Sequence, residues 1–358
     1  MVRPARGKEF GALAAQSRPR PKCDGGVVAT SAMISSQCDR PYVREVRGDA
    51  LKEGLRNLCV RRMVRHIVAA FRDAVEEAQW MTPEARTEAR RKLENIRARI
   101  GHPDRWREYT GLRITPDDLI GNVERGQQFE NRFRMNRLRR PSRGYWTVTP
   151  QTVNAFYLPA LNEITLPAAI LQPPLFDPEA EDAVNYGAIG ALIGHEIGHA
   201  FDLRGRQFNA YGRMLDWWTP RDVQQFTARA QLLVDQFGTF PALGGRRVDG
   251  QMTLSENIGD LGGLAVAVRA YRRSLDGRAP PVIDGFTGEQ RLLIGWAQMW
   301  RSRMRDDFLR QTLLLSQHAP PQYRAHGALM NLETFYSAFD VRPGDRLYLE
   351  PKKRVQIW

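Results

Sequence analysis

The chain has 358 residues, of which 42% are hydrophobic and 26% are charged, and its formal net charge is +13. This composition is typical of a soluble globular protein with one large or two smaller domains, and it excludes a disordered chain. No run of about 18 apolar residues occurs, so we expect no membrane span. The basic N-terminus lacks the apolar stretch of a secretory signal. A cytoplasmic location is the default expectation, with a periplasmic or extracellular one if the natural N-terminus lies upstream.

The positive charge raises the question of nucleic-acid binding. The basic residues are mostly arginine and are spread along the chain, with the densest stretch at residues 132–144, and no nucleic-acid-binding motif accompanies them. We therefore expect a solvated basic surface and no nucleic-acid partner, which makes a nucleic-acid-binding protein the least favoured function. The three cysteines, Cys23, Cys38 and Cys59, lack CxxC spacing, and we interpret them as reduced thiols without a structural role.

The first part of the chain is expected to be helical. Residues 1–42 have little periodicity, which predicts a poorly ordered segment. From residue 43 to about residue 100, apolar residues recur every three to four positions, as in helices that pack on a core. One helix should begin after Thr82, which can cap it, and end near Gly101. We see no catalytic residue in this stretch.

The pattern changes after residue 145. Residues 152–167 contain two short strand-like runs broken by Pro159 and Pro167, which predicts a small antiparallel sheet. Further helices are predicted at residues 185–203, 255–275 and 288–304. The expected fold class is therefore mainly α with a small antiparallel β-sheet.

Residues 194–202, GHEIGHAFD, carry two histidines four positions apart. On a helix, His195 and His199 project from one face, where their imidazoles can bind one metal ion. Glu196 can then reach a water molecule on that metal without binding the metal itself. This HExxH pattern is a known metalloprotease motif. Unrelated helices also contain it by chance, so two ordinary surface histidines are the alternative.

A catalytic zinc ion needs a third protein ligand and an open position for water. No third histidine follows closely, which argues against the HExxHxxGxxH class. In SENIGD, residues 255–260, Ser255 can cap a helix that carries Glu256 and Asp260 on one face. Glu256 can complete a His₂Glu ligand set, while Asp260 or Asp202 can accept a proton from a ligating histidine. Acidic residues in a first helical turn are usually only partners of the helix dipole, so this motif alone is weak.

Several longer motifs occur in one order along the chain: VNAFY, GHEIGHAFD, LDWWT, SENIGDLGG, HAPPQYR and the C-terminal IW. Together they resemble the catalytic half of the neprilysin family of zinc metallopeptidases, closely over residues 145–358 and more loosely over residues 43–145. The resemblance implies a thermolysin-like zincin catalytic domain at residues 119–358, preceded by a remnant of a helical lobe at residues 43–118. Members are much longer, and residues 1–42 show no clear counterpart.

The resemblance also implies roles at the catalytic centre. His195, His199 and Glu256 would bind one Zn²⁺, and Glu196 would act as general base. Asp260 and Asp202 would orient the histidines. His318 would donate a hydrogen bond to the oxyanion that forms in the transition state.

Contacts with a peptide substrate follow from the same resemblance. Asn154 and Ala155 would pair with the substrate backbone as an added edge strand. Arg324 would hold a substrate carbonyl beyond the scissile bond. The pocket for the side chain after the cut would be apolar, with the lining residues Ile170, Leu175, Ala191, Leu192, Met299 and Trp300.

The chain departs from the family at three supporting positions. Leu203, Ser316 and Gln356 stand where aspartate, aspartate and arginine are usual, whereas the metal ligands are intact. We predict a zinc-dependent endopeptidase that cuts oligopeptides on the amino side of hydrophobic residues. The alternative is a truncated remnant that binds zinc, turns over poorly and exposes apolar surface.

Overall fold

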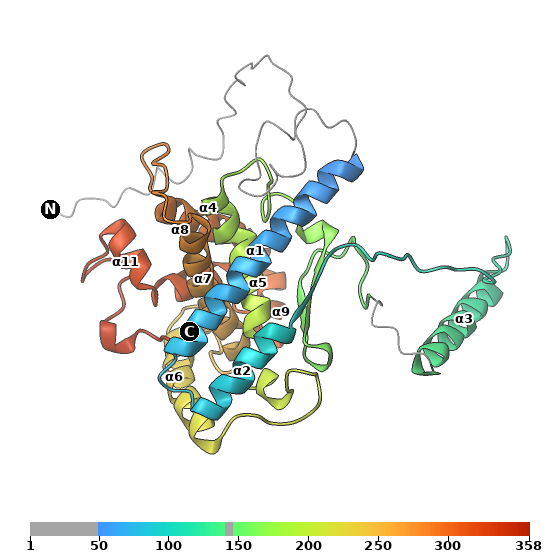
Figure 1. Cartoon of the computed structure of the whole chain (residues 1–358), viewed down its shortest axis with the longest axis horizontal. Helices are drawn as coiled ribbons and strands as arrows, with labels where there is room; N and C mark the ends of the chain where they lie inside the picture. Colours follow the sequence, from blue (N-terminus) through green and yellow to red (C-terminus); the bar gives the residue numbers. More distant parts are fainter. Residues whose placement is uncertain (1–48, 140–145) are drawn as a thin grey trace, which may run out of the picture. The chain divides into compact units, whose positions relative to one another are not determined.

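The structure is a computed structural model that describes residues 49–139 and 146–358. Helices dominate these residues, and one small sheet accompanies them (Figure 1). The expectation of a mainly α protein with a small β-sheet is confirmed. Cys23, Cys38 and the segment expected to be poorly ordered, residues 1–42, lie outside the described residues.

The helices and strands have the following bounds. The α-helices are α1 (Asp49–Glu77), α2 (Pro83–Asn95), α3 (Leu119–Arg139), α4 (Asp182–Asn185), α5 (Ala191–Gly198), α6 (Pro220–Gly238), α7 (Leu254–Ser274), α8 (Gly288–Met299), α9 (Asp306–Leu315), α10 (Pro321–Leu329) and α11 (Glu333–Phe339). A π-helical turn, η6 (Tyr186–Gly190), joins α4 to α5. The strands are β1 (Arg97–Gly101), β2 (Phe156–Leu158) and β3 (Glu163–Pro167).

The sheet is mixed rather than purely antiparallel, and this corrects the prediction. Its order is β1-β3-β2, with β2 antiparallel and β1 parallel to β3. Strand β1 was not predicted, since its residues were expected to form the end of a helix. In the structure that helix, α2, already ends at Asn95, and Ile96 is extended. Within the described residues β2 pairs with β3 alone, so its other edge is open to a further strand.

One buried carboxylate joins the N-termini of α2 and α6. The Thr82 side chain caps α2, as predicted, by accepting a hydrogen bond from the Ala85 amide. The carboxylate of Asp222, in the first turn of α6, accepts hydrogen bonds from the amide and hydroxyl of Thr82 at 2.7 and 2.9 Å. It also accepts from the amide and hydroxyl of Thr219 at 2.8 and 2.6 Å. The N-caps of two helices far apart in sequence, Thr82 and Thr219, therefore depend on Asp222, which lies 140 residues after Thr82.

Helices α5 and α7 pack closely against each other, and α1 crosses both (Figure 1). Glycines allow this approach: a Cβ on Gly263 would lie 2.5 Å from the Ala191 carbonyl oxygen and 2.5 Å from the His195 backbone nitrogen. A Cβ on Gly259 would lie 2.7 Å from the His195 ring. Any side chain at these positions would push the helix carrying the HExxH motif away from the helix carrying SENIGD.

Three helix predictions meet different outcomes. The predicted helix at 185–203 is divided into α4, η6 and α5 and ends at Gly198, while 255–275 corresponds to α7 and 288–304 to the shorter α8. Ser255 does not cap α7, because the N-cap is Thr253. Ser255 lies in the first turn instead, and its hydroxyl donates to Asp202 at 2.9 Å.

Aromatic side chains fill the core beside α1. The Trp358 ring lies 5.8 Å from Phe71, 5.5 Å from Trp80 and 5.6 Å from Phe201, measured between ring centroids. Cys59 on α1 is disulfide-bonded, so the interpretation of the cysteines as reduced thiols is wrong for this residue. None of the described helices combines the length and apolar character that a membrane crossing requires.

Candidate metal centre

The structure brings His195, His199 and Glu256 together at the α5–α7 contact. One ligand atom from each lies within 4.8 Å of the other two. The two Nε2 atoms are 3.1 Å apart, and the Glu256 carboxylate lies 3.2 Å from His195 Nε2 and 3.8 Å from His199 Nε2. Donors of a tetrahedral zinc site are about 3.3 Å apart, because zinc–nitrogen bonds measure about 2.0–2.1 Å. The three residues therefore fit one zinc ion without rearrangement of the backbone.

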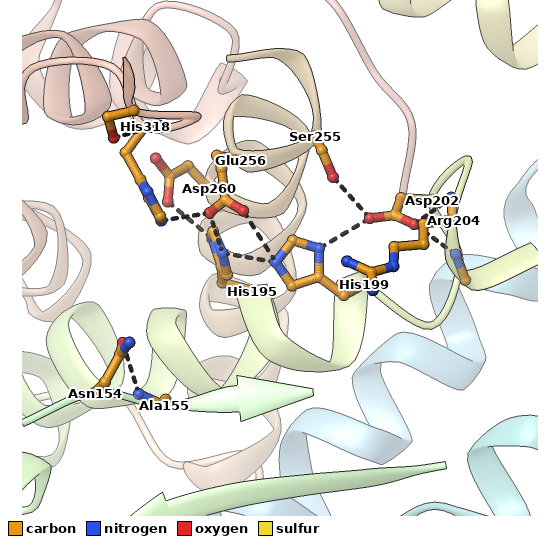
Figure 2. Close-up of polar contacts among 12 residues, drawn as sticks. Asn154, Ala155, His195, His199, Asp202, Arg204, Ser255, Glu256, Asp260 and His318 are labelled. Carbon is orange, nitrogen blue, oxygen red and sulfur yellow. Dashed lines mark hydrogen bonds and ion pairs between the residues drawn. The ribbon is translucent and has the colours of Figure 1, made fainter. Parts of the chain in front are cut away.

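Two carboxylates hold the imidazole rings from behind. Asp260 lies 2.9 Å from His195 Nδ1, and Asp202 lies 2.9 Å from His199 Nδ1 (Figure 2). Nδ1 of each ring is therefore engaged, and Nε2 of each faces the common point, as in carboxylate–histidine–zinc arrangements. Burial by itself lowers the pKa of His195, but hydrogen bonds with Asp260 and Glu256 outweigh it and raise that pKa to about 10. A histidine binds a metal through an unprotonated ring nitrogen, so a proton and a metal ion compete for His195.

Glu196 lies beside the ligands without joining them. Its side chain is buried and lines the same cleft. Burial is the main cause that raises its pKa, and the negative charge of Glu256 adds to the effect, whereas the neighbouring histidines oppose it. A carboxylate with a raised pKa is better suited to accept a proton from water near neutral pH and to release it again.

The two C-terminal site residues differ in their surroundings. His318 Nε2 lies 2.8 Å from Glu256, and its side chain is half exposed, on the opposite side of His195 from Asp202 (Figure 2). The Ser316 hydroxyl accepts the His318 amide at 3.0 Å. Arg324 is buried, and its Nε and Nη2 both donate to Asp260 at 2.7 Å. Its guanidinium also lies 4.0 Å from the Trp300 ring centroid, so in this structure it chiefly fixes Asp260.

A cleft of about 900 Å³ runs past the three ligands. Its lining includes Asn154, Ala155 and five of the predicted apolar pocket residues: Ile170, Leu175, Leu192, Met299 and Trp300. Ala191 was predicted with them but does not line the cleft: it is fully buried, and its backbone carbonyl faces Gly263 at the α5–α7 contact. The Ala155 amide donates to Asn154 Oδ1 at 2.9 Å, directly before the open edge strand β2 (Figure 2).

Two further residues at the site had not been predicted from sequence. Lys92 on α2 is fully buried, and its Nζ donates to the carbonyls of Ala200, Gly205 and Phe208 at 2.8, 2.9 and 2.7 Å. Burial lowers the pKa of Lys92 to about 7, although only the ammonium form can donate to all three carbonyls at once. The sequence did contain one sign that Lys92 is buried: it follows Ala89 by three residues and so lies on the same, buried side of α2. The other is Arg204, which lines the cleft.

A family model for peptidase family M13 matches residues 154–355, which is more than half of the chain. The chain belongs to peptidase family M13. This is the neprilysin family, so the resemblance drawn from the motifs is confirmed. A second M13 model, for the N-terminal part, matches residues 2–103. The expectation that residues 1–42 have no counterpart in the family is therefore wrong.

Relatives within the M13 family match most of this chain. It is 36% identical to mouse membrane metallo-endopeptidase-like 1 over 84% of its own length and 41% of that protein. It is 33% identical to human neprilysin over 83% of its length and 41% of that protein. Among solved structures, zinc metalloprotease Zmp1 from Mycobacterium tuberculosis in complex with an inhibitor is 43% identical, with a TM-score of 0.81 over 89% of this chain and 48% of that one.

The chain thus spans about half the length of the M13 relatives that it matches. The default expectation of a cytoplasmic location finds no support, since one relative carries "membrane" in its name and Cys59 is disulfide-bonded. Because the relatives include zinc metalloproteases, zinc is the metal that the family implies for the His195–His199–Glu256 cluster.

Proposed function

We propose that the chain is a zinc-dependent endopeptidase in which His195, His199 and Glu256 bind one Zn²⁺. The observation that carries this proposal is the convergence of three ligand atoms within 4.8 Å, with both histidines held by carboxylates. When bound, the ion supplies Lewis-acid polarisation of the peptide carbonyl and acidification of a water molecule. Because the cleft contains an open edge strand beside the ligands, an extended peptide is the substrate class that fits it.

The chain's own residues divide the remaining chemistry. Glu196 takes a proton from the attacking water and passes it to the leaving amine, a role favoured by its burial and raised pKa. His318, half exposed at the cleft, donates a hydrogen bond to the carbonyl oxygen as negative charge develops on it. Arg324 keeps Asp260 ionised and in place, and one of its terminal nitrogens is left to reach a substrate carbonyl.

Substrate preference follows from the lining of the cleft. The backbone beside Asn154 and Ala155 would pair with the peptide, once the Asn154 side chain releases the Ala155 amide. The apolar residues Leu192, Met299 and Trp300 would receive the side chain that follows the cut. Cleavage on the amino side of hydrophobic residues is therefore expected. We place this activity outside the cytoplasm, where the Cys59 disulfide would persist.

The test measures zinc content together with cleavage of a quenched fluorescent peptide. The wild type and Glu196→Gln should each contain one zinc ion per chain. Wild-type cleavage should stop when a chelator is added, and the variant should lose at least about 10²-fold in kcat, because general-base catalysis contributes about 10²–10⁴-fold. Zinc without cleavage would favour the truncated-remnant alternative. Absence of zinc would refute the ligand set.

A further inference from the structure

We propose that Arg204 selects peptides with an acidic side chain on the amino side of the scissile bond. This inference rests on the proposed peptidase function and concerns the half of the cleft that the apolar pocket does not occupy. Arg204 is exposed and lines the cleft. In the view of Figure 2 its side chain is drawn on the His199 side of the Arg204 backbone, and the exposed residue lines the same cleft as the ligands.

The position of Arg204 along the cleft sets which part of a peptide it meets. Leu192, in the apolar pocket, precedes the first histidine ligand by three residues on α5, whereas Arg204 follows the second by five. Figure 2 likewise shows His318 and Asn154 on one side of the two histidines, and Asp202 and Arg204 on the other. A peptide whose carbonyl lies at the metal and whose next side chain enters the apolar pocket must extend its preceding residues toward Arg204.

The guanidinium of Arg204 has no anionic partner within the described part of the chain. The adjacent carboxylate, Asp202, is fully engaged: its Oδ1 accepts the amides of Arg204 and Gly205 at 2.8 and 2.7 Å. Its Oδ2 lies 2.9 Å from His199 Nδ1 and accepts the Ser255 hydroxyl at 2.9 Å. Asp202 therefore anchors the backbone of Arg204 without neutralising its side chain.

The other arginine that lines the cleft cannot play this role. Arg324 is buried, and two of its nitrogens donate hydrogen bonds to Asp260. Arg204 is thus the cation, among the described lining residues, that is free to meet a substrate carboxylate. A guanidinium binds a carboxylate through two parallel hydrogen bonds, which favours glutamate or aspartate over their amides. The net charge of +13 would also increase the rate at which acidic peptides arrive.

The experiment uses quenched fluorescent peptides that carry phenylalanine after the cut and Glu, Gln or Lys at the first, second or third residue before it. Mass spectrometry verifies the cleaved bond. The wild type should prefer Glu over Gln at one of these positions by about fivefold in kcat/KM, a typical effect of a solvent-accessible ion pair. The preference should disappear in Arg204→Gln and turn toward Lys in Arg204→Glu. It should also weaken as salt is added.

Arg206→Gln is the matched control, because it removes the same charge two residues away. Arg206 forms an ion pair with Asp216 and does not line the cleft. This variant should keep the preference for Glu. The proposal is overturned if the wild type shows no preference at any position, if Arg204→Gln retains it, or if Arg206→Gln loses it to the same extent, which would indicate net charge alone.

A binding measurement separates failure of this inference from failure of the proposed function. Fluorescence anisotropy of a labelled Glu or Gln peptide with zinc-loaded Glu196→Gln protein requires no turnover. Suppose that the wild type cleaves no peptide, but that the Glu peptide binds about fivefold more tightly than the Gln peptide. If this difference disappears when Arg204 is also replaced, selection by Arg204 stands without the proposed activity. Equal binding of both peptides refutes it.

Discussion

At the scale of single residues, Lys92 connects α2 to the segment that follows α5, the helix carrying the HExxH motif. Its ammonium group joins the carbonyls of Ala200, Gly205 and Phe208, on either side of Asp202, which in turn orients His199. Periodicity placed this part of α2 on the core, but it gave no reason to expect a charged residue there. The partners of Lys92 come from more than 100 residues away in sequence, and only the folded chain brings them together.

Lys92→Met should destabilise the fold and weaken metal binding together. Each buried carbonyl left without a partner costs about 1–3 kcal/mol, so we expect a loss of about 3 kcal/mol or more in the free energy of unfolding. Urea unfolding and competition with a zinc chelator would measure the two effects. Lys352→Met makes the same change on an exposed side chain and should alter neither. Unchanged zinc affinity in Lys92→Met would contradict the link to Asp202.

Asp222 makes stability depend on pH. Burial by itself raises the pKa of its carboxyl, but the hydrogen bonds from Thr219 and Thr82 outweigh it and lower the pKa below the ordinary 3.8. The folded state therefore binds this proton less tightly than the unfolded state does. The stabilisation is complete above the unfolded pKa and is lost as pH falls through the lower folded value.

Asp222→Asn should therefore cost about 2 kcal/mol at pH 7 and flatten the acid side of the stability curve. Urea titrations at pH 7, 5 and 3.5 would reveal a difference from the wild type that shrinks at the lowest pH. Asp235→Asn removes a carboxylate from the exposed face of the same helix, α6, and serves as the control. A difference that stays constant with pH would disprove the assignment.

At the scale of elements, the distance between α5 and α7 determines whether the three ligands meet. His195 and His199 come from the end of α5, and Glu256 from the first turn of α7. The sequence predicted both helices from periodicity and the ligands from the HExxH and SENIGD motifs. It could not predict the close crossing, because a glycine in a helix reads only as a weak helix former until its neighbours are known.

Gly263→Ala should impair zinc binding more than it impairs helix formation. The added methyl would lie 2.5 Å from backbone atoms of Ala191 and His195, which cannot rotate away. Overpacking of this kind costs about 1–3 kcal/mol and would separate the ligands. Gly238→Ala is the control, since nothing lies within 4 Å of its Cβ. Zinc titration by calorimetry should show weaker binding for Gly263→Ala alone, and equal affinities would show that the helices tolerate the separation.

The sheet shows which strands a local sequence pattern predicts and which it does not. The two strands within residues 152–167 were predicted from short runs broken by proline. Strand β1 was missed because Arg97–Gly101 continues a helical pattern, and its parallel pairing with β3 is set by a partner 66 residues further along. Parallel pairs depend on such distant contacts, which a short window of sequence does not contain.

At the scale of the whole molecule, family membership was predictable, whereas the extent of the match was not. Six motifs in one order identify the M13 family, because a chance match of that length is improbable. The match of residues 2–103 to the N-terminal model shows that the first segment has a counterpart in the family, which its sequence pattern had not indicated. The boundary drawn at residue 118 stays a prediction; α1 packs against α7 and against α2.

Exposed apolar side chains, expected of a truncated remnant, do occur on α3. Leu119, Ile120 and Leu138 are each more than 70% exposed. They do not decide the question of activity, because every residue of the proposed catalytic centre lies within the residues from 154 onward and is already in place. The roles of these residues stay predictions that the metal and peptide measurements above address.

The burial of Trp358 has a consequence for how the protein is made. Its ring packs against Phe71, Trp80 and Phe201, and a Cβ on Gly262 of α7 would lie 2.5 Å from it. The ribosome adds residue 358 after all of these partners have left the exit tunnel. The growing chain therefore lacks the ring that packs against Gly262 of α7 until Trp358 has been added. Every other member of this cluster is therefore made before the residue that completes its packing.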